Sequence, residues 1–543
     1  MSTTVSREQA GRPALFTRKA TGLVRQGRTR DALFYNVMWS SVALTFAFFW
    51  ILYPLAYQGS NAILAFLIAA ALGLPGAFLY AMLAQVMPRT GGDYVFNSRA
   101  LHPVAGFAAN VSYCFWLAVV YGVYTTYIAA YGIGAFSRVM AGYTGSSGWL
   151  SFGDWFSTEA GLFITGSAAV LLSALMFMLG GTRMFFRVQV GAFVLYMLGA
   201  FLLPVLVGVF QGGDGFAANF NDYAANLGTA DGMSALQKSA ADAGYAATGF
   251  SFEATLKSVS VFWFIFGFIY SSNYFAGEIR LQRRTHLRSI PGALLVAVLF
   301  LLVLTPAYLH YADYDLNGML GFADPAVYGF AAGAPAYPEI AAIASGSPVF
   351  GAVIVLGFTA GLLIWLPQTM LLISRSMFAW SFDRIMPERL SYVDPRSRSP
   401  IVAIGVVTVL AIASTAVYSF TDWFSTLSVL LGLSLTLLVT AVAGAVLPYR
   451  QRAMVAASPY ARTVVGLPLF TVVGGLALLG FGIAVAILLW DPGSGASLSE
   501  NPGKLGLAAV VYAVAVAVYF VSRAIRRRQG IDFELAYREL PPE

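Results

Sequence analysis

Twelve long stretches of the chain consist almost wholly of apolar residues, and they constrain its fold more than any other feature. Each is close to 20 residues long or longer, which is about the length that a helix needs to cross a bilayer. None carries Asp, Glu, Lys or Arg near its middle, where one such residue would cost roughly 2.5–3.5 kcal/mol. Overall, 58% of the 543 residues are hydrophobic and only 10% are charged. The sequence therefore predicts an all-α integral membrane protein with twelve spans, approximately at 33–54, 62–87, 104–137, 160–180, 188–210, 258–277, 291–309, 349–373, 401–419, 425–448, 464–490 and 505–522.

The basic residues of the loops fall unevenly on the two sides of such a bundle. When the N-terminus is placed inside and the sides alternate, 28 of the 32 Lys and Arg lie inside, and only Arg138, Lys238, Lys257 and Lys504 lie outside. Because cytoplasmic loops are enriched in Lys and Arg, this asymmetry predicts a multi-pass cell-membrane protein with both termini in the cytoplasm. The outer loops are acidic, which we interpret as solvation in preference to attraction of cations.

The spans leave little of the chain for anything else. We expect a basic cytoplasmic N-terminal segment at 1–31, a transmembrane domain at 32–522 and a cytoplasmic C-terminal tail at 523–543. No separate soluble domain and no contact with nucleic acid are expected, and the oligomeric state stays open.

The residue inventory argues against three classes of membrane enzyme. An ATP-driven pump needs a Gly-rich phosphate loop that ends in Lys-Ser or Lys-Thr, and none of the four Lys has that context. A haem protein needs axial ligands within its spans, whereas His102, His286 and His310 lie at helix ends or in loops. An intramembrane hydrolase needs a buried acid or a Ser–His pair. We therefore expect no enzyme, no cofactor and no metal site, but a neutral interior suited to moving a small solute.

The first and sixth spans combine polar and aromatic residues at mid-depth. Ser40 and Ser41 lie in the first, and Gly267 interrupts an aromatic run in the sixth. Gly267 weakens a helix, and freed backbone groups in a membrane are tolerated where they line a cavity. The ends of a broken helix present N–H and C=O dipoles that can hold a carboxylate and an ammonium. The alternative is that Gly267 lets two helices pack closely while the hydroxyls bond across helices; both interpretations stay open.

The third span carries a stripe of aromatic residues on one helical face. Its spacing places these rings on one side, where they could stack on a substrate or cradle an ammonium group. Packing and interfacial anchoring are the commoner roles of such residues. The stripe consists of Tyr113, Trp116, Tyr124, Tyr127 and Tyr131, of which Tyr113 and Trp116 are candidate substrate contacts.

Four short motifs resemble those of one transporter family. The loop after the second span reads Pro88-Arg89-Thr90-Gly91-Gly92-Asp93-Tyr94, the sixth span ends in Gly277-Glu278-Ile279-Arg280, and the eighth is followed by Ser374-Arg375-Ser376 with Asp383-Arg384. Gly466-Leu467-Pro468-Leu469 lies at the entry to the eleventh. In this order, the motifs resemble those of the amino acid–polyamine–organocation (APC) permeases.

The resemblance implies two inverted five-helix repeats, at about 32–210 and 258–448, followed by two further helices at about 464–522. It also implies a substrate site where the first and sixth spans unwind at the membrane midplane. The substrate-binding residues that it implies are Ser40, Ser41, Val42, Phe266, Gly267 and Phe268, with Phe264 and Trp365 added by position.

The chain departs from the family pattern at three places. No Gly lies between Gly27 and Gly59, so Ser40 and Ser41 would have to replace the usual glycine break of the first span. Ile269 stands where many relatives carry an acidic residue, and the fifth span has no Lys. Substrate and ion coupling therefore both stay open, with either a proton or sodium as the coupling ion.

Two carboxylates lie beside the inner ends of the spans. Glu278 and Asp93 are candidate proton carriers, although we favour for both a structural salt bridge with Arg89, Arg99 or Arg280, which would still act as a gate. Sodium would need only neutral oxygens, such as those of Ser40 or Thr359.

These observations predict a secondary transporter for an amino acid or related amine. Exchange or uniport without ion coupling is the nearest alternative. A pore-type channel would show repeated selectivity-filter residues, which are not evident in the sequence. A receptor would require a large soluble signalling domain, which is not evident either.

Overall fold

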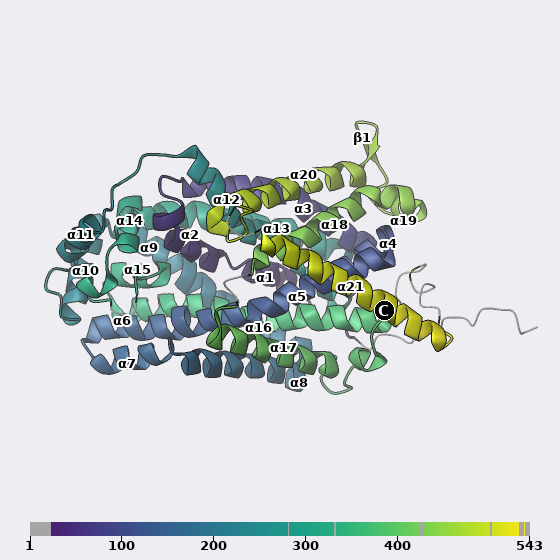
Figure 1. The fold of residues 1–543 in the computed structure, drawn as a ribbon, viewed down its shortest axis with the longest axis horizontal. Coiled ribbons are helices and arrows are strands. Elements are labelled where there is room, and N and C mark those ends of the chain that lie inside the picture. Colours follow the sequence, from purple (N-terminus) through teal and green to yellow (C-terminus); the bar gives the residue numbers. More distant parts are fainter. Residues whose placement is uncertain are drawn as a thin grey trace, which may run out of the picture.

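The computed structural model describes residues 23–280, 282–330, 333–423, 427–499, 502–531 and 537. Among these residues, 11 helices or broken helices are long and apolar enough to cross a membrane, and they lie roughly along the long axis of the molecule (Figure 1). They are α1 and α2 (Thr29–Trp39, Val42–Ala56), α3 (Ala62–Val86), α5 with η2 and α6 (Pro103–Tyr127, Ile128–Gly134, Ala135–Thr144), α8 with η3 and α9 (Glu159–Met197, Leu198–Leu202, Leu203–Phe210), α12 with η4 (Phe252–Phe266, Ser271–Glu278), α13 (Gln282–Tyr311), α16 (Pro348–Phe382), α17 (Ile401–Phe420), α18 (Val429–Arg450), α20 (Leu469–Trp490) and α21 (Gly503–Arg528).

The fourth and fifth expected spans lie in one helical segment, Glu159–Phe210. Gly181 divides it, because its φ of 60° and ψ of −161° are not helical. A side chain at Gly181 would collide with the carbonyl oxygen of Ser397, so the bend requires glycine. The predicted separation at 180–188 is thus a bend in a helix and not a loop.

Two other helices continue past the apolar stretches that predicted them. The third span extends to Thr144 through the π-helical segment η2, in line with the expected helical extension. The eighth extends to Phe382, which places Arg375 inside α16 and not in the following loop, where the sequence analysis put it.

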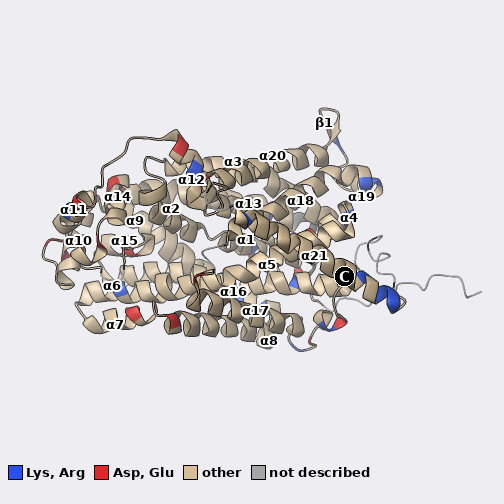
Figure 2. Cartoon of the chain, viewed as in Figure 1, with Lys and Arg blue, Asp and Glu red and all other residues tan. Residues whose placement is uncertain are grey.

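The two ends of the bundle differ in charge, and we name them accordingly. The basic end carries α4 (Asp93–Ala100), η6 (Glu388–Ser391), α19 (Arg452–Ala456), the two-residue strands β1 (Thr463–Val464) and β2 (Leu467–Pro468) and the end of α21. The acidic end carries α7 (Ser147–Trp155), α10 (Gly213–Asn226), α11 (Gly232–Asp242), α14 (Tyr314–Phe322), η5 (Pro325–Tyr328), α15 (Tyr337–Ala344) and η8 (Pro492–Ser494). Figure 2 shows the blue Lys and Arg of α19 and α21 at one end and red Asp and Glu around α7, α10 and α14 at the other.

The first span is the most enclosed of the eleven. In its most apolar stretch 83% of the residues are buried, against 17% for α21, so the first span lies at the centre of the bundle and α21 at its edge. Around it α13 packs along α3, α18 along α20, and α16 along α8. Most of the residues 1–31 expected as an N-terminal segment, and most of the tail after 531, lie outside the described residues.

Candidate functional site

The first span is broken at the serine pair that the sequence analysis singled out. α1 ends at Trp39, Ser41 adopts a left-handed conformation with φ 49° and ψ 46°, and α2 begins at Val42. A left-handed residue other than glycine costs roughly 1–2 kcal/mol. Contacts hold it there: the Ser41 and Tyr124 hydroxyl oxygens are 2.6 Å apart, and Ser40 Oγ donates to the Val37 carbonyl over 2.8 Å.

The sixth span is broken after Phe266. Gly267 caps α12, the chain then leaves the α-helical path, and η4 continues it as a 3₁₀ helix from Ser271 to Glu278. A Cβ at Gly267 would lie 2.7 Å from Cε2 of Trp263 and 2.9 Å from its carbonyl oxygen. The glycine therefore leaves room for a tryptophan of its own helix.

Close approach between helices at this depth occurs at Gly73 of α3 instead. A Cβ there would lie 2.5 Å from the carbonyl oxygen of Phe266, the last residue of α12. The interpretation that Gly267 itself admits a neighbouring helix is thus replaced by contact at Gly73.

The two breaks are joined directly by hydrogen bonds. Asn36 Nδ2 donates to Ser272 Oγ over 3.1 Å, and the Ser272 backbone N–H donates to Asn36 Oδ1 over 2.9 Å. Both side chains are fully buried. Since Asn36 lies one turn before the first break and Ser272 lies just after the second, α1 and η4 are held together as a unit.

Stacked aromatic rings surround the first break. Trp365 of α16 lies between Tyr124 and Trp39, with ring centroids 3.7 Å and 5.1 Å away. Tyr124 in turn contacts the hydroxyl of Ser41. Trp365 Nε1 is buried without a hydrogen-bond partner among the described residues, so this ring stack retains a free donor.

A second aromatic group lies beside the sixth-span break. The ring of Phe268 is 5.9 Å from Phe264 and 6.5 Å from Tyr113, and Tyr113 stacks on Tyr274 at 5.7 Å. Trp116, also predicted, packs instead against Gly432 of α18, where a Cβ would overlap its indole. Among the described residues, no hydrogen bond or ring contact joins Trp116 to either break.

A cavity of about 290 Å³ lies between α2, α5, α12 and α18 and reaches η8 of the acidic end. Thr45 of α2, Tyr124 and Tyr127 of α5 and Phe264 of α12 contribute to its wall, together with α18 and η8. This volume and its largely apolar wall, which includes four aromatic side chains, suit a small organic solute. Of the predicted substrate residues, Phe264 lines the cavity, whereas Ser41 and Trp365 reach it through Tyr124.

At the basic end, Glu278 forms a buried ion pair. Arg375 Nε donates to Glu278 Oε1 over 2.6 Å and Arg375 Nη2 to Oε2 over 3.1 Å, while the Thr182 hydroxyl donates to Oε2 over 2.6 Å. The predicted salt bridge exists, but the predicted partners Arg89, Arg99 and Arg280 were wrong. The partner is Arg375, whose place inside α16 the apolar pattern did not show.

The three predicted arginines have other roles. Arg99 forms an ion pair with Asp383, 2.7 Å from Nη2 to Oδ2, with both side chains buried. Arg280 is exposed, and its Nε donates to the Arg25 carbonyl over 3.1 Å. Half-buried Arg89 donates from Nη1 to the Pro88 carbonyl over 3.3 Å.

Asp93 is the second predicted carboxylate, and it forms no ion pair with the residues that the structure describes. It is fully buried, Tyr274 donates a hydrogen bond to its Oδ2 over 2.9 Å, and its Oδ1 has no partner there. Burial raises the pKa of Asp93 to about 7, against the opposing effect of the Tyr274 hydrogen bond. The predicted salt bridge of Asp93 is therefore wrong.

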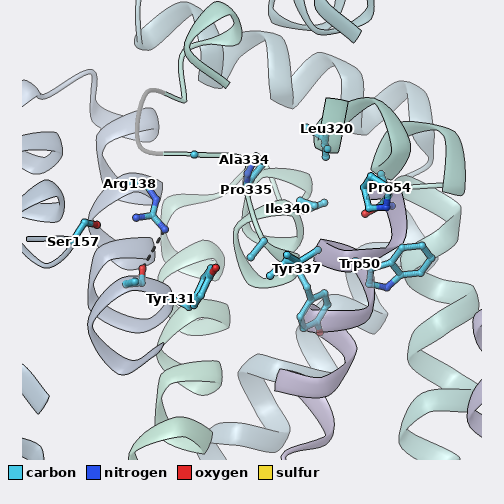
Figure 3. A pocket seen from close by; sticks show the side chains of 16 residues that line it. Trp50, Pro54, Tyr131, Arg138, Ser157, Leu320, Ala334, Pro335, Tyr337 and Ile340 are labelled. Carbon is cyan, nitrogen blue, oxygen red and sulfur yellow. Dashed lines mark hydrogen bonds between the residues drawn. The ribbon is translucent and has the colours of Figure 1, made fainter. Parts of the chain in front are cut away.

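The acidic end contains a separate cavity of about 300 Å³ (Figure 3). Trp50, Tyr131, Tyr337 and Arg138 are among its lining residues. Arg138 Nε donates to Oε1 of Glu339 on α15 over 2.7 Å, and Nη2 donates to the Ala130 carbonyl over 3.2 Å. The ion pair between Arg138 and Glu339 thus borders this cavity.

The fold is that of a multi-span membrane protein. The family model for amino acid permeases matches residues 32–518, and the chain belongs to that family. The match confirms the resemblance to the APC permeases. No match is found among the curated proteins.

Proposed function

We propose that this chain is a secondary transporter that moves an amino acid or a related amine across the cell membrane by alternating access. The proposal includes twelve spans, with the long segment Glu159–Phe210 counted twice, and it places the basic end in the cytoplasm. The observation that carries it is the pair of adjacent helix breaks, at Ser41 and after Phe266, joined through Asn36 and Ser272.

The chemistry of the breaks suits a zwitterion. A helix that begins at Val42 presents backbone N–H groups with positive dipole character, and a helix that ends at Phe266 presents carbonyl oxygens with negative character. Together they can hold the carboxylate and the ammonium of an amino acid without a charged side chain. The aromatic wall with Phe264 and Tyr124 would receive the rest of the substrate.

Alternating access requires that the two ends open in turn. In this conformation the cavity lined by Thr45 and Tyr124 reaches η8 of the acidic end, while Glu278 and Arg375 form an ion pair at the basic end. We infer that substrate enters from the acidic end and leaves when the basic-end contacts separate. Exchange and uniport follow the same route and differ only in what drives the cycle.

Reconstitution into lipid vesicles tests the proposal. A panel of amino acids and amines is first screened for thermal stabilisation of the purified protein, and the stabilising compound is then used in labelled form. Saturable uptake supports the proposal. Unsaturable ion current would mean a pore, and stabilisation without any flux would mean a receptor.

A glycine pair supplies the matched variants. In Gly267→Leu the new side chain collides with Trp263, so uptake should be abolished. In Gly475→Leu on α20 a Cβ meets nothing within 4 Å, so uptake should persist. Equal uptake by the two variants at equal protein yield would place the substrate site elsewhere.

A further inference from the structure

The loop that carries Asp93 is attached to the 3₁₀ part of the sixth span. The Gly91 N–H donates to the Tyr274 carbonyl over 3.0 Å, and the Tyr274 hydroxyl donates back to Asp93 over 2.9 Å. Gly91 and Gly92 have φ of 113° and 50°, which glycine adopts most readily. A Cβ at Gly92 would lie 3.0 Å from the ring of Tyr274, so the loop and η4 are in close contact. A change in the charge of Asp93 therefore directly alters a hydrogen bond of η4.

The groups that face Asp93 from the neighbouring helices are neutral. They come from α3, α5, the sixth span and α21, and each is affected by its negative charge. These groups are Tyr80, Tyr113, Cys114, Tyr270, Tyr274 and Tyr512. A carboxylate enclosed by hydroxyls and a thiol, without a cation beside it, is costly to keep ionised.

Among the described residues, the nearest elements that carry charge supply no counter-ion to Asp93 either. On α4 itself, Arg99 is paired with Asp383, and on α16 Arg375 is paired with Glu278. α18 also packs on α4, but its titratable residues, Tyr449 and Arg450, are exposed at its end. Asp93 is therefore enclosed like Glu278, but among the described residues it has no arginine paired with it as Arg375 is paired with Glu278.

We propose that Asp93 is the proton-binding site that couples transport, and that Tyr274 communicates its charge to the break in the sixth span. One carboxylate oxygen takes a proton from water to give the neutral acid and later returns it to water. The ionised form accepts a charge-assisted hydrogen bond from Tyr274, which is about twice as strong as a neutral one. Protonation weakens that bond and loosens η4 at the basic end. The pKa of about 7 allows both forms near neutral pH.

This inference rests on the proposed transport function, so its first test is independent of transport. Infrared spectra of the full chain in lipid are recorded from mildly acidic to mildly alkaline pH, for the wild type and Asp93→Asn. A carboxylic-acid C=O band that titrates near pH 7 in the wild type, and is missing from the variant, supports the proposal. Identical titrations in the two proteins would overturn it.

The second test separates coupling from substrate binding. In vesicles, Asp93→Asn should lose accumulation driven by a pH gradient but keep exchange of labelled for unlabelled substrate, which also shows that it folds. Asp93→Glu should regain part of the gradient-driven uptake. Asp491→Asn is the matched control, because Asp491 is also a buried carboxyl with tyrosine and serine donors, but at the acidic end.

The outcomes distinguish the two proposals. If the wild type takes up no amino acid or amine, the proposed function fails. The infrared spectra would still show whether Asp93 binds a proton near pH 7. If the wild type transports but accumulates substrate with sodium alone, or if Asp93→Asn keeps the wild-type response to a pH gradient, the role of Asp93 is overturned.

Discussion

The basic and acidic ends of the bundle are closed in different ways. At the basic end Glu278–Arg375 and Arg99–Asp383 are ion pairs whose side chains are at most 2% exposed. At the acidic end the pair Arg138–Glu339 borders a cavity of about 300 Å³, and the Arg138 side chain is 11% exposed. The two ion pairs of the basic end are therefore enclosed, whereas the pair of the acidic end borders a cavity.

Under the proposed alternating access, this difference indicates which contacts must separate. An enclosed ion pair is strongly destabilised when one partner is lost, whereas a partly solvated pair loses less, since water replaces some of its interactions. Opening the basic end requires water or substrate to replace the contacts of Arg375 with Glu278 and Thr182. Opening the acidic end needs less, because its ion pair already borders a cavity.

The largest effect is expected at the pair Glu278–Arg375. Glu278→Gln leaves the buried Arg375 without its counter-charge and should lower the free energy of unfolding by about 3–5 kcal/mol. Denaturant unfolding in detergent measures this decrease in the free energy of unfolding. The double variant Glu278→Gln with Arg375→Met should recover part of the loss, and recovery of none would mean that the pair is not the cause.

Asp93 should make the free energy of unfolding of the whole protein depend on pH, because its ionised form is buried without a counter-charge among the described residues. Its pKa rises from the ordinary 3.8 to about 7, so the folded protein holds more protons than the unfolded chain between these values. The contribution of Asp93 to stability is thus complete below about pH 4 and is lost as pH rises through 7, by about 1.4 kcal/mol per pH unit. Unfolding of the wild type relative to Asp93→Asn measures this trend, and a constant difference across the window would contradict it.

At the acidic end, loss of the ion pair should matter less. Arg138→Gln removes a charged hydrogen bond to Glu339 and should cost about 1.5–3 kcal/mol. The same unfolding measurement compares it with Glu278→Gln. If the two variants lose equal stability, the contrast between an enclosed ion pair and a partly solvated one is wrong.

The smallest effect concerns the break between the two ends. Ser41→Gly relieves the left-handed backbone, worth about 1–2 kcal/mol, but loses the hydrogen bond to Tyr124. Ser41→Ala loses that hydrogen bond and keeps the strain. We therefore expect Ser41→Gly to be more stable than Ser41→Ala by about 1 kcal/mol, and the reverse order would mean that Ser41 is not left-handed in the membrane.

Much of this architecture follows from the sequence. Because a charged residue is costly in lipid, long apolar stretches without charges mark the spans. Polar Ser40 and Ser41 in the first span, and Gly267 in the sixth, also marked the places where the two helices break. The amino acid permease family was recognised from its short motifs.

The interactions between spans were not predictable in the same way. Arg375 follows the apolar stretch of the eighth span, so hydropathy gives no sign that α16 continues and buries it. Its pairing with Glu278 depends on how spans six and eight pack, which no local pattern encodes. The alignment of Trp365 between Tyr124 and Trp39 likewise comes from three separate helices.

Substrate protection at Thr45 tests most directly whether the path of the solute runs beside the two breaks. Thr45 lines the cavity next to Ser41, and the single cysteine, Cys114, is buried and can be replaced by alanine. In that background Thr45→Cys should react with a membrane-impermeant thiol reagent applied to the acidic end. Modification should stop uptake, and the transported amino acid should slow the reaction. A reaction rate that the amino acid leaves unchanged, with full uptake after modification, would contradict a substrate path at the broken helices.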